Sequence, residues 1–311
     1  MRLLLAYLCL LFSFESLSEE NTLTDKALPK ADFLQNRLNT MMQDTASWLD
    51  GIGDDTDGVN SKGVNSNDNK ASANGYLQLS WLPRTANLDD VDANFKVALN
   101  LPQWNERLAL VIDNDDEDEV LLDYESNYVN NNQDGVNVAF QYIKQFNQQR
   151  QIKNRIGISR KQLYLRSEMQ FNWLVQQINL KLQPRLDYFL QDGWGPGAKA
   201  VVTYPLEQSY FSLSASWQKI QSESRSRRKV GFYHIKPAGN NKLFVSGVQY
   251  IKSNNQADTS NESYYLSIRY RNLVYKSWMY FEVEPFIEFN QLNNFKREAG
   301  IALSLISYYG N

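Results

Sequence analysis

The sequence predicts an all-β protein, a transmembrane antiparallel up-and-down β-barrel of about 14 strands, with 12 strands as the alternative. Three observations predict this fold. Apolar and polar side chains alternate from Tyr76 to the end of the chain, short and long connections alternate between the strands, and aromatic residues gather near strand ends. Because successive side chains of a strand lie on opposite faces, each segment carries one apolar and one polar face.

The composition excludes several other classes of protein. The 311 residues carry 32 Lys and Arg against 35 Asp and Glu, a balance that argues against a nucleic-acid binder. A single Cys excludes a disulfide framework, and a single His excludes a His-rich metal site. The mean hydropathy of −0.52 argues against a helical membrane protein. We expect no metal and no cofactor.

Residues 1–18 predict a cleaved secretory signal peptide. Arg2 supplies a positive charge, residues 3–14 form an apolar stretch, and Ser16 and Ser18 are the small residues of a cleavage site. Since no later run approaches about 18 consecutive apolar residues, the mature chain contains no transmembrane helix. The sequence therefore predicts export to the cell outer membrane of a Gram-negative envelope.

The region before the barrel is predicted to have two parts. Residues 19–50 form a periplasmic segment whose apolar residues recur at helical spacing over 31–50, which indicates an amphipathic helix. This helix packs on its own protein, plugs the lumen, binds a periplasmic partner or lies on a membrane surface, and the pattern leaves these alternatives open. Residues 51–75 are rich in Gly, Asn, Asp and Ser and predict a flexible linker. The barrel then covers residues 76–311.

Strand length favours a barrel over a secreted β-sandwich. The predicted strands have about 9–13 residues, whereas sandwich strands are nearer to about 5–6 and tilted spanning strands need about 9–11. Short turns on one rim and long polar loops on the other are typical of an outer-membrane barrel with its N-terminus in the periplasm. The predicted strands are 76–83, 93–101, 107–114, 135–145, 152–160, 163–172, 178–190, 197–205, 209–219, 228–237, 242–252, 263–272, 278–290 and 297–308.

The tryptophans predict two interfacial girdles, because an indole ring near a strand end can lie at the boundary between lipid and water. Six of the seven Trp stand at such positions: Trp81, Trp104, Trp173, Trp194, Trp217 and Trp278. The last strand is apolar on one face and resembles the terminal signal read by the barrel-assembly machinery, which we expect as a partner during biogenesis. The chain departs from that signal by ending in Gly310 and Asn311.

Two stretches, 95–118 and 264–285, resemble a family of uncharacterised proteobacterial outer-membrane β-barrel proteins. The matching elements are a helix ending near a Trp, an LxLP turn, an acidic loop and a late W-x-x-x-E-x-E-P strand. The resemblance implies the fold and the location of this chain but no activity. In this sequence the elements are Trp48, residues 99–102, residues 113–119, Trp278, Glu282, Glu284 and Pro285.

Two charged segments lie in predicted long loops. Eight acids and no base fall between Asp113 and Glu125, which favours a solvated acidic loop over a calcium site, since the spacing lacks the central glycine and final Glu of an EF-hand. A basic cluster is expected to contact outer-membrane lipid, by pairing with lipopolysaccharide phosphates, or to be ordinary surface charge. That cluster consists of Arg225, Arg227, Arg228 and Lys229.

Charges on the polar faces of the strands are predicted to line the lumen, either as an ion-pair ladder that fills it or as a pore lining of mixed sign. About 8 strands give a filled interior and about 16–18 an aqueous channel, so a barrel of about 14 lies between these cases. The predicted lining charges are Arg166, Glu168, Lys181, Arg185, Asp187, Arg269, Arg271, Glu282, Glu284 and Glu288.

We predict that the protein is not an enzyme and has no catalytic residues. The only histidine, His234, shares a face with apolar residues, and no serine is established beside it as a nucleophilic pair requires. The predicted function is a porin-like narrow channel or passive transporter for small polar solutes. The alternatives are a non-conducting structural or envelope-assembly barrel that binds a periplasmic partner through residues 31–50, and an outer-membrane lipid-modifying or proteolytic enzyme.

Overall fold

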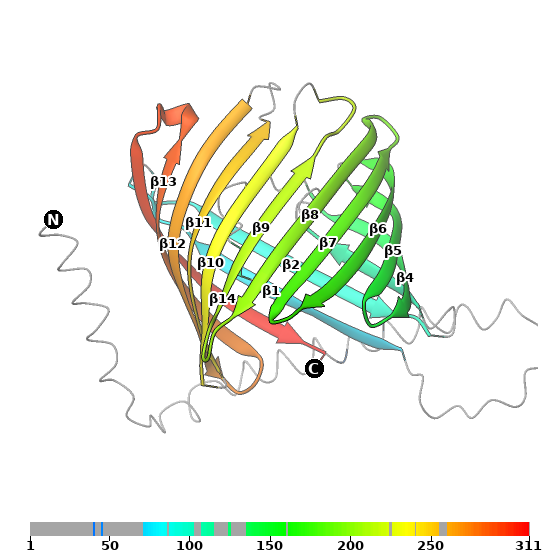
Figure 1. The fold of residues 1–311 in the computed structure, drawn as a ribbon, viewed down its shortest axis with the longest axis horizontal. Coiled ribbons are helices and arrows are strands. Elements are labelled where there is room, and N and C mark those ends of the chain that lie inside the picture. Colours follow the sequence, from blue (N-terminus) through cyan, green and yellow to red (C-terminus); the bar gives the residue numbers. More distant parts are fainter. Residues whose placement is uncertain are drawn as a thin grey trace, which may run out of the picture. The chain divides into compact units, whose positions relative to one another are not determined.

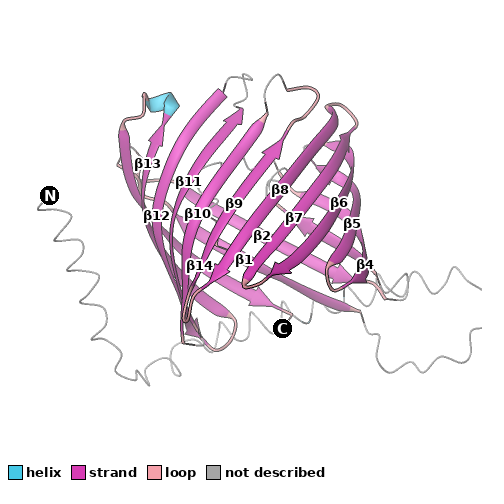
Figure 2. Cartoon of the chain, in the orientation of Figure 1, coloured by secondary structure: helices cyan, strands magenta, loops and turns pink. Residues whose placement is uncertain are grey.

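A computed structural model shows a closed barrel of 14 antiparallel strands (Figures 1 and 2). It describes residues 71–85, 87–102, 107–114, 124–125, 135–159, 161–223, 226–239, 241–254 and 260–310, together with positions 40 and 45. The strands are β1 Ser72–Trp81, β2 Val91–Asn100, β3 Leu108–Asp113, β4 Asn137–Asn147, β5 Arg150–Ser159, β6 Gln162–Val175, β7 Ile178–Phe189, β8 Gly193–Pro205, β9 Tyr210–Gln218, β10 Arg227–Ala238, β11 Lys242–Asn254, β12 Ser260–Tyr275, β13 Met279–Asn290 and β14 Arg297–Tyr309.

Each strand pairs with its neighbours in sequence, and the first and last strands pair with each other. β1 pairs with β2 from Ser72 to Trp81 and with β14 from Gly75 to Trp81. The even number of strands brings the start of β1 and the end of β14 to the same rim, which carries the short turns (Figure 1). The prediction of a 14-stranded antiparallel barrel is therefore confirmed, and the alternative of 12 strands is excluded.

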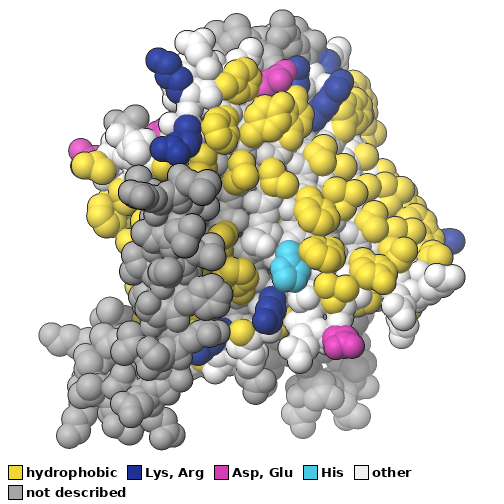
Figure 3. All heavy atoms as spheres, turned by 60° about the vertical axis from the view of Figure 1, so that its left-hand side comes forward, with side chains coloured by type: hydrophobic (Ala, Val, Ile, Leu, Met, Phe, Trp, Pro, Cys, Tyr) yellow, Lys and Arg dark blue, Asp and Glu magenta, His cyan; other side chains and the backbone are white. Residues whose placement is uncertain are grey.

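The barrel is apolar on the outside and polar on the inside, the reverse of a soluble protein. In β7, the Asp187 side chain is 0% exposed, while its neighbours Leu186 and Tyr188 are 45% and 39% exposed. The same alternation runs through β6 and β13. Figure 3 shows the resulting cover of hydrophobic side chains over one side of the barrel. This distribution is that of a barrel whose outer surface faces lipid.

The predicted girdle of tryptophans is present in part. Trp81, Trp194 and Trp217 are 47%, 53% and 42% exposed near the long-loop rim, and Trp173 is 42% exposed near the short-turn rim. Trp278 was wrongly included, because it lies in the turn between β12 and β13, only 8% exposed, with its ring edge-on to Tyr275 at 5.7 Å between centroids. Trp104 lies outside the described residues.

The predictions for the N-terminal region lie almost wholly outside the described residues. These are the signal peptide 1–18, the amphipathic segment 19–50 and most of the linker 51–75. β1 begins at Ser72, inside the predicted linker. Among the described residues, no helix is long and apolar enough to cross a membrane.

The outward face of β9 offers a test of lipid exposure. Leu213 stands in the middle of this strand and is 46% exposed. The variant Leu213→Lys should lose about 2–4 kcal/mol of unfolding free energy, because a charge is placed against acyl chains near the midplane. Leu88→Lys is the matched control, since Leu88 is 67% exposed outside the strands. Urea titration in lipid vesicles measures both, and equal stability of the two variants would exclude the membrane placement of β9.

Candidate functional site

An ion-pair ladder follows the inner face of two neighbouring strands, β12 and β13. Arg271 donates from Nε to Glu282 at 2.8 Å, and Arg269 pairs with Glu284 at 2.8 Å and with Glu282 at 3.4 Å. The Tyr265 hydroxyl donates to Glu284 at 3.3 Å. Successive inward residues are two positions apart, so the antiparallel register aligns arginines on one strand with glutamates on the other. The four charges therefore neutralise one another inside the barrel.

A second cluster occupies the inner face of β6 and β7. The Asp187 carboxylate accepts from Arg166 at 2.6 Å and pairs with Arg185 at 3.2 Å. The Arg166 guanidinium also lies over the Tyr164 ring, 5.5 Å from its centroid. With two arginines on one carboxylate, this cluster has a surplus of positive charge.

Two inward glycines of β8 leave the space that this cluster occupies. A Cβ on Gly195 would lie 3.2 Å from the Cβ of Asp187, and one on Gly197 would lie 3.6 Å from the Nε of Arg185. Gly195, Pro196 and Gly197 all lie within β8. A side chain at Gly195 would therefore press on Asp187, whereas the approach of Gly197 to Arg185 is an ordinary contact.

A short segment of the β3–β4 connection, Tyr124 and Glu125, reaches into the lumen. The Glu125 carboxylate accepts from Lys199 at 2.8 Å and from Ser214 at 2.6 Å, and it lies 3.8 Å from the Nζ of Lys229. Its main-chain oxygen accepts from Arg269 at 3.3 Å. We call this set the Glu125 latch: Glu125, Lys199, Ser214, Lys229 and Arg269.

Tyr124 holds the same segment on the other side. Its hydroxyl lies 2.6 Å from the Ser212 hydroxyl, and its ring is edge-on to Tyr233 at 5.1 Å between centroids. Glu125 is itself only 4% exposed. Together with the latch, these contacts fix the segment to strands β8, β9, β10 and β12.

The charge state of Glu125 follows from its surroundings. Burial by itself raises the pKa of the carboxyl, but the charges of Lys229 and Lys199 and the hydrogen bonds from Lys199 and Ser214 outweigh it. The net effect is a pKa of Glu125 below its ordinary value. The carboxylate is therefore ionised at neutral pH.

All ten residues predicted to line the lumen stand at inward positions of their strands. Eight of them are less than a tenth exposed, whereas Lys181 and Arg271 are half-buried. Glu288 accepts a hydrogen bond from Arg84 at 2.9 Å. Sequence reasoning missed Lys199 and Ser214 as site residues. The alternation of inward and outward residues in β8 and β9 places both side chains in the lumen. It gives no sign of their common partner Glu125, which belongs to a loop distant in sequence.

The predicted basic cluster does not form a single surface. Lys229 is buried in the lumen as part of the latch, because β10 begins at Arg227 and alternation turns Lys229 inward. Arg228 is exposed, and Arg227 pairs with Glu223. Arg225 lies outside the described residues. The grouping of all four toward lipid phosphates was wrong for Lys229.

The two described ends of the acidic run are likewise buried rather than solvated. Asp113 is 4% exposed at the end of β3 and accepts from Asn137 at 3.1 Å, and Glu125 belongs to the latch. The acids between them lie outside the described residues. Within the described parts of the chain, no group of three His, Cys, Asp or Glu side chains is placed to hold a metal ion.

The inner wall formed by β5 to β8 carries an excess of cations. Within residues 150–205, six inward cations stand against two inward carboxylates. In register, Lys153 lies opposite Glu168, and Arg155 lies opposite Arg166. The cations are Lys153, Arg155, Arg166, Lys181, Arg185 and Lys199, and the carboxylates are Glu168 and Asp187.

The residues considered for enzymatic chemistry have other surroundings. His234 lies on the outer face, with its ring 5.0 Å from the Phe211 ring between centroids. Ser246 is its register partner on β11, but no hydrogen bond joins His234 to any described side chain. Glu282, Glu284 and Asp187 are all engaged with arginines. None of these groups forms a nucleophile–base pair.

Comparisons with known proteins show the fold alone. No protein-family model matches the chain, and no curated protein matches it. Among solved structures, it is similar to the in-vitro folded outer-membrane protein OmpT of Vibrio cholerae, with a TM-score of 0.52, 8% identity, and coverage of 80% of this chain and 100% of that one. A loop L8 deletion mutant of the same protein gives a TM-score of 0.52 and 8% identity over 77% of this chain and 99% of that one. The chain therefore has the fold of an outer-membrane β-barrel, and its family membership stays a prediction.

The Glu125 latch should weaken as the pH falls, because the pKa of Glu125 is lowered in the folded protein. A depressed folded-state pKa means that the stabilisation is present above the ordinary pKa of about 4.3 and is lost as the pH falls through the folded value. We expect hydrogen–deuterium exchange of residues 124–125 to be equally slow at pH 7 and pH 5, after correction for intrinsic rates, and fast at strongly acidic pH.

Glu125→Gln is the matched variant, because it keeps the shape of the side chain and removes its charge. We expect the segment to exchange faster than in the wild type at pH 7 and pH 5, with a local loss of about 3 kcal/mol, since buried lysines are left without their counter-charge. At strongly acidic pH, where Glu125 is itself uncharged, the two proteins should exchange alike. If the variant and the wild type were equally protected at pH 7, the latch would not hold the segment.

Proposed function

We propose that this protein is a narrow outer-membrane channel for small polar solutes, with a preference for anions. The observation that carries this proposal is the inner wall of β5 to β8, where six cations stand against two carboxylates of the wall and the carboxylate of Glu125, which pairs with Lys199. A surplus of fixed charge along a confined lumen concentrates solutes of the opposite sign and repels those of the same sign.

The width of the barrel supports a narrow passage. Fourteen strands lie between the filled barrels of about 8 strands and the open ones of about 16–18. The Glu125 latch brings a loop segment into this lumen, and the ladders of β12–β13 and β6–β7 project from its wall. The remaining passage suits small solutes rather than folded or polymeric ones.

Export and membrane insertion complete the proposal. The signal peptide predicted at 1–18 would direct the chain out of the cytoplasm, and the barrel-assembly machinery would insert it. At the long-loop rim, Arg228 is an exposed cation suited to lipopolysaccharide phosphates. The helix predicted over 31–50 would lie on the periplasmic side, where it could meet a partner.

Planar-bilayer recording tests the channel and its selectivity. We expect the folded full-length protein to pass current, and its reversal potential in a KCl gradient to show anion preference. Replacing Lys153 and Arg155 by Gln should lower the anion-to-cation permeability ratio by roughly twofold to fourfold, since two unit charges about 10 Å from an ion in water contribute roughly 0.8 kcal/mol. Lys144→Gln is the matched control, because Lys144 is exposed on the outer face of β4. An unchanged ratio in the double variant would reject the selectivity.

A second candidate function is a non-conducting structural barrel of the cell envelope. The observation that favours it is the near-complete burial of lumen charges, since Asp187 and Glu284 are each 0% exposed. In that case the ion pairs serve as packing that stiffens the wall. A folded sample that passes no current, even as Glu125→Gln, would favour this function over the channel.

A further inference from the structure

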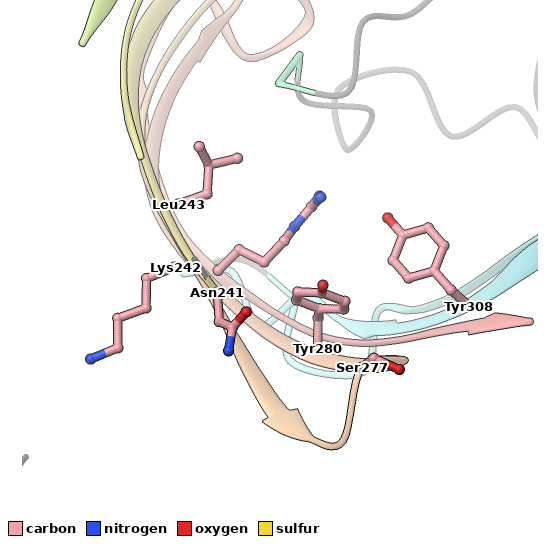
Figure 4. Close-up of a pocket in the computed structure, with 7 residues that line it drawn as sticks. Asn241, Lys242, Leu243, Ser277, Tyr280 and Tyr308 are labelled. Atoms are coloured by element: carbon pink, nitrogen blue, oxygen red, sulfur yellow. The ribbon is translucent and has the colours of Figure 1, made fainter. Parts of the chain in front are cut away.

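A pocket opens on the inner face of the barrel near the short-turn rim, apart from the latch and from the β6–β7 cluster. It has a volume of about 330 Å³, and Arg271, Tyr280, Tyr308 and Leu243 contribute to its lining. These residues belong to β11, β12, β13 and β14. Figure 4 shows the Tyr280 and Tyr308 rings on one side of the wall, and Lys242 on the other with its ammonium directed away. The volume lies at the lower end of the range for small-molecule sites.

The guanidinium of Arg271 can only donate hydrogen bonds, and the hydroxyl and amide groups of the lining, among them the Tyr280 hydroxyl, can donate as well as accept. Arg271 donates a hydrogen bond to Glu282 through its Nε only, and within the described residues its two terminal amino groups have no partner. The Tyr280 hydroxyl likewise makes no hydrogen bond to any described residue. A guanidinium can engage two carboxylates at once, one on each edge of its planar fork.

The charge in the lining of the pocket favours an anionic ligand. Among the described residues that line it there is no Asp or Glu, and Arg271 is the cation whose charge faces the inner side of the wall, whereas the ammonium of Lys242 is directed away (Figure 4). Glu282 lies beside the pocket but already serves two arginines, Arg271 at 2.8 Å and Arg269 at 3.4 Å. The terminal amino groups of Arg271 can therefore donate to an incoming anion, and no carboxylate in the lining competes for them.

The apolar part of the lining suits a ring. Tyr280 and Tyr308 pack edge-on, with centroids 5.6 Å apart at 90°, and Tyr76 continues the group at 6.2 Å from Tyr308. Leu243 adds an aliphatic surface. Aromatic side chains held at fixed angles offer edges and faces to a flat apolar ligand.

We propose that this pocket is a binding subsite for small aromatic carboxylates. The carboxylate of the ligand would lie on the free edge of Arg271 with a hydrogen bond from Tyr280, and its ring would pack against Tyr280, Tyr308 and Leu243. The subsite rests on the proposed channel for its biological route of access, since it names the class of anion that the lumen would pass. Its occupancy can be measured without any current.

Benzoate is the probe, and benzyl alcohol is its uncharged counterpart with the same ring. We expect saturation-transfer NMR on the folded full-length protein in detergent micelles to report benzoate binding, with much weaker transfer to benzyl alcohol. The same titration on micelles without protein corrects for partition into detergent.

Arg271→Gln removes the charge and should weaken benzoate binding roughly tenfold or more, since hydrogen bonds to charged groups are the strong ones. Glu282 keeps Arg269 as its partner in this variant. Tyr280→Phe keeps the ring and should cause a smaller loss. Lys236→Gln is the matched control, because Lys236 is exposed on the outer face of β10 near the same rim. The gel-mobility shift on heating checks that each variant is folded.

Benzoate binding that is equal in Arg271→Gln and wild type would overturn the subsite, as would absent binding to the wild type or equal binding of benzyl alcohol. These results are distinguishable from a failure of the channel. Conduction with Arg271-independent binding rejects the subsite alone, whereas Arg271-dependent binding without conduction rejects the channel alone.

Discussion

Closure of the sheet between β1 and β14 is the constraint on which the rest of the structure depends. In lipid, an edge strand would leave a row of N–H and C=O groups without partners, each costing several kcal/mol. The pairing of β1 with β14 removes that edge and fixes the register, with Tyr76 opposite Tyr308. Because side chains alternate with a period of two, one closed register sorts the barrel into an apolar exterior and a charged interior.

In the closed barrel, the charged side chains that point inward are buried together and must be neutralised by one another. Arg269 connects the two features of the lumen, since it pairs with Glu284 and also donates to the main-chain oxygen of Glu125. Through Lys199 and Lys229, the same Glu125 reaches β8 and β10. Electrostatics therefore couples a loop segment to β8, β10 and β12, and cations still outnumber carboxylates on β5 to β8 after Lys199 has paired with Glu125.

Much of the barrel could be predicted from the sequence because strand patterning is local. The inward positions of Arg166, Arg269 and Glu284 follow from alternation alone, whichever strands lie beside them. The wrong predictions concern residues at the ends of strands, where a strand gives way to a turn or loop. Lys229 was grouped with loop cations although it falls within the predicted strand 228–237, where alternation turns it inward. Trp278 was assigned to a girdle, but the turn between β12 and β13 buries it.

The sequence by itself determined the strands, their inward and outward faces and the broad class of membrane barrel, since each of these depends on residues two positions apart. Only the tertiary structure decided which charges become partners. Glu125 lies 74 positions from Lys199 and 144 from Arg269, and no periodicity reports such a meeting. The pocket around Arg271 and Tyr280 is likewise a product of four adjacent strands, because the closed register brings their inward side chains to one height.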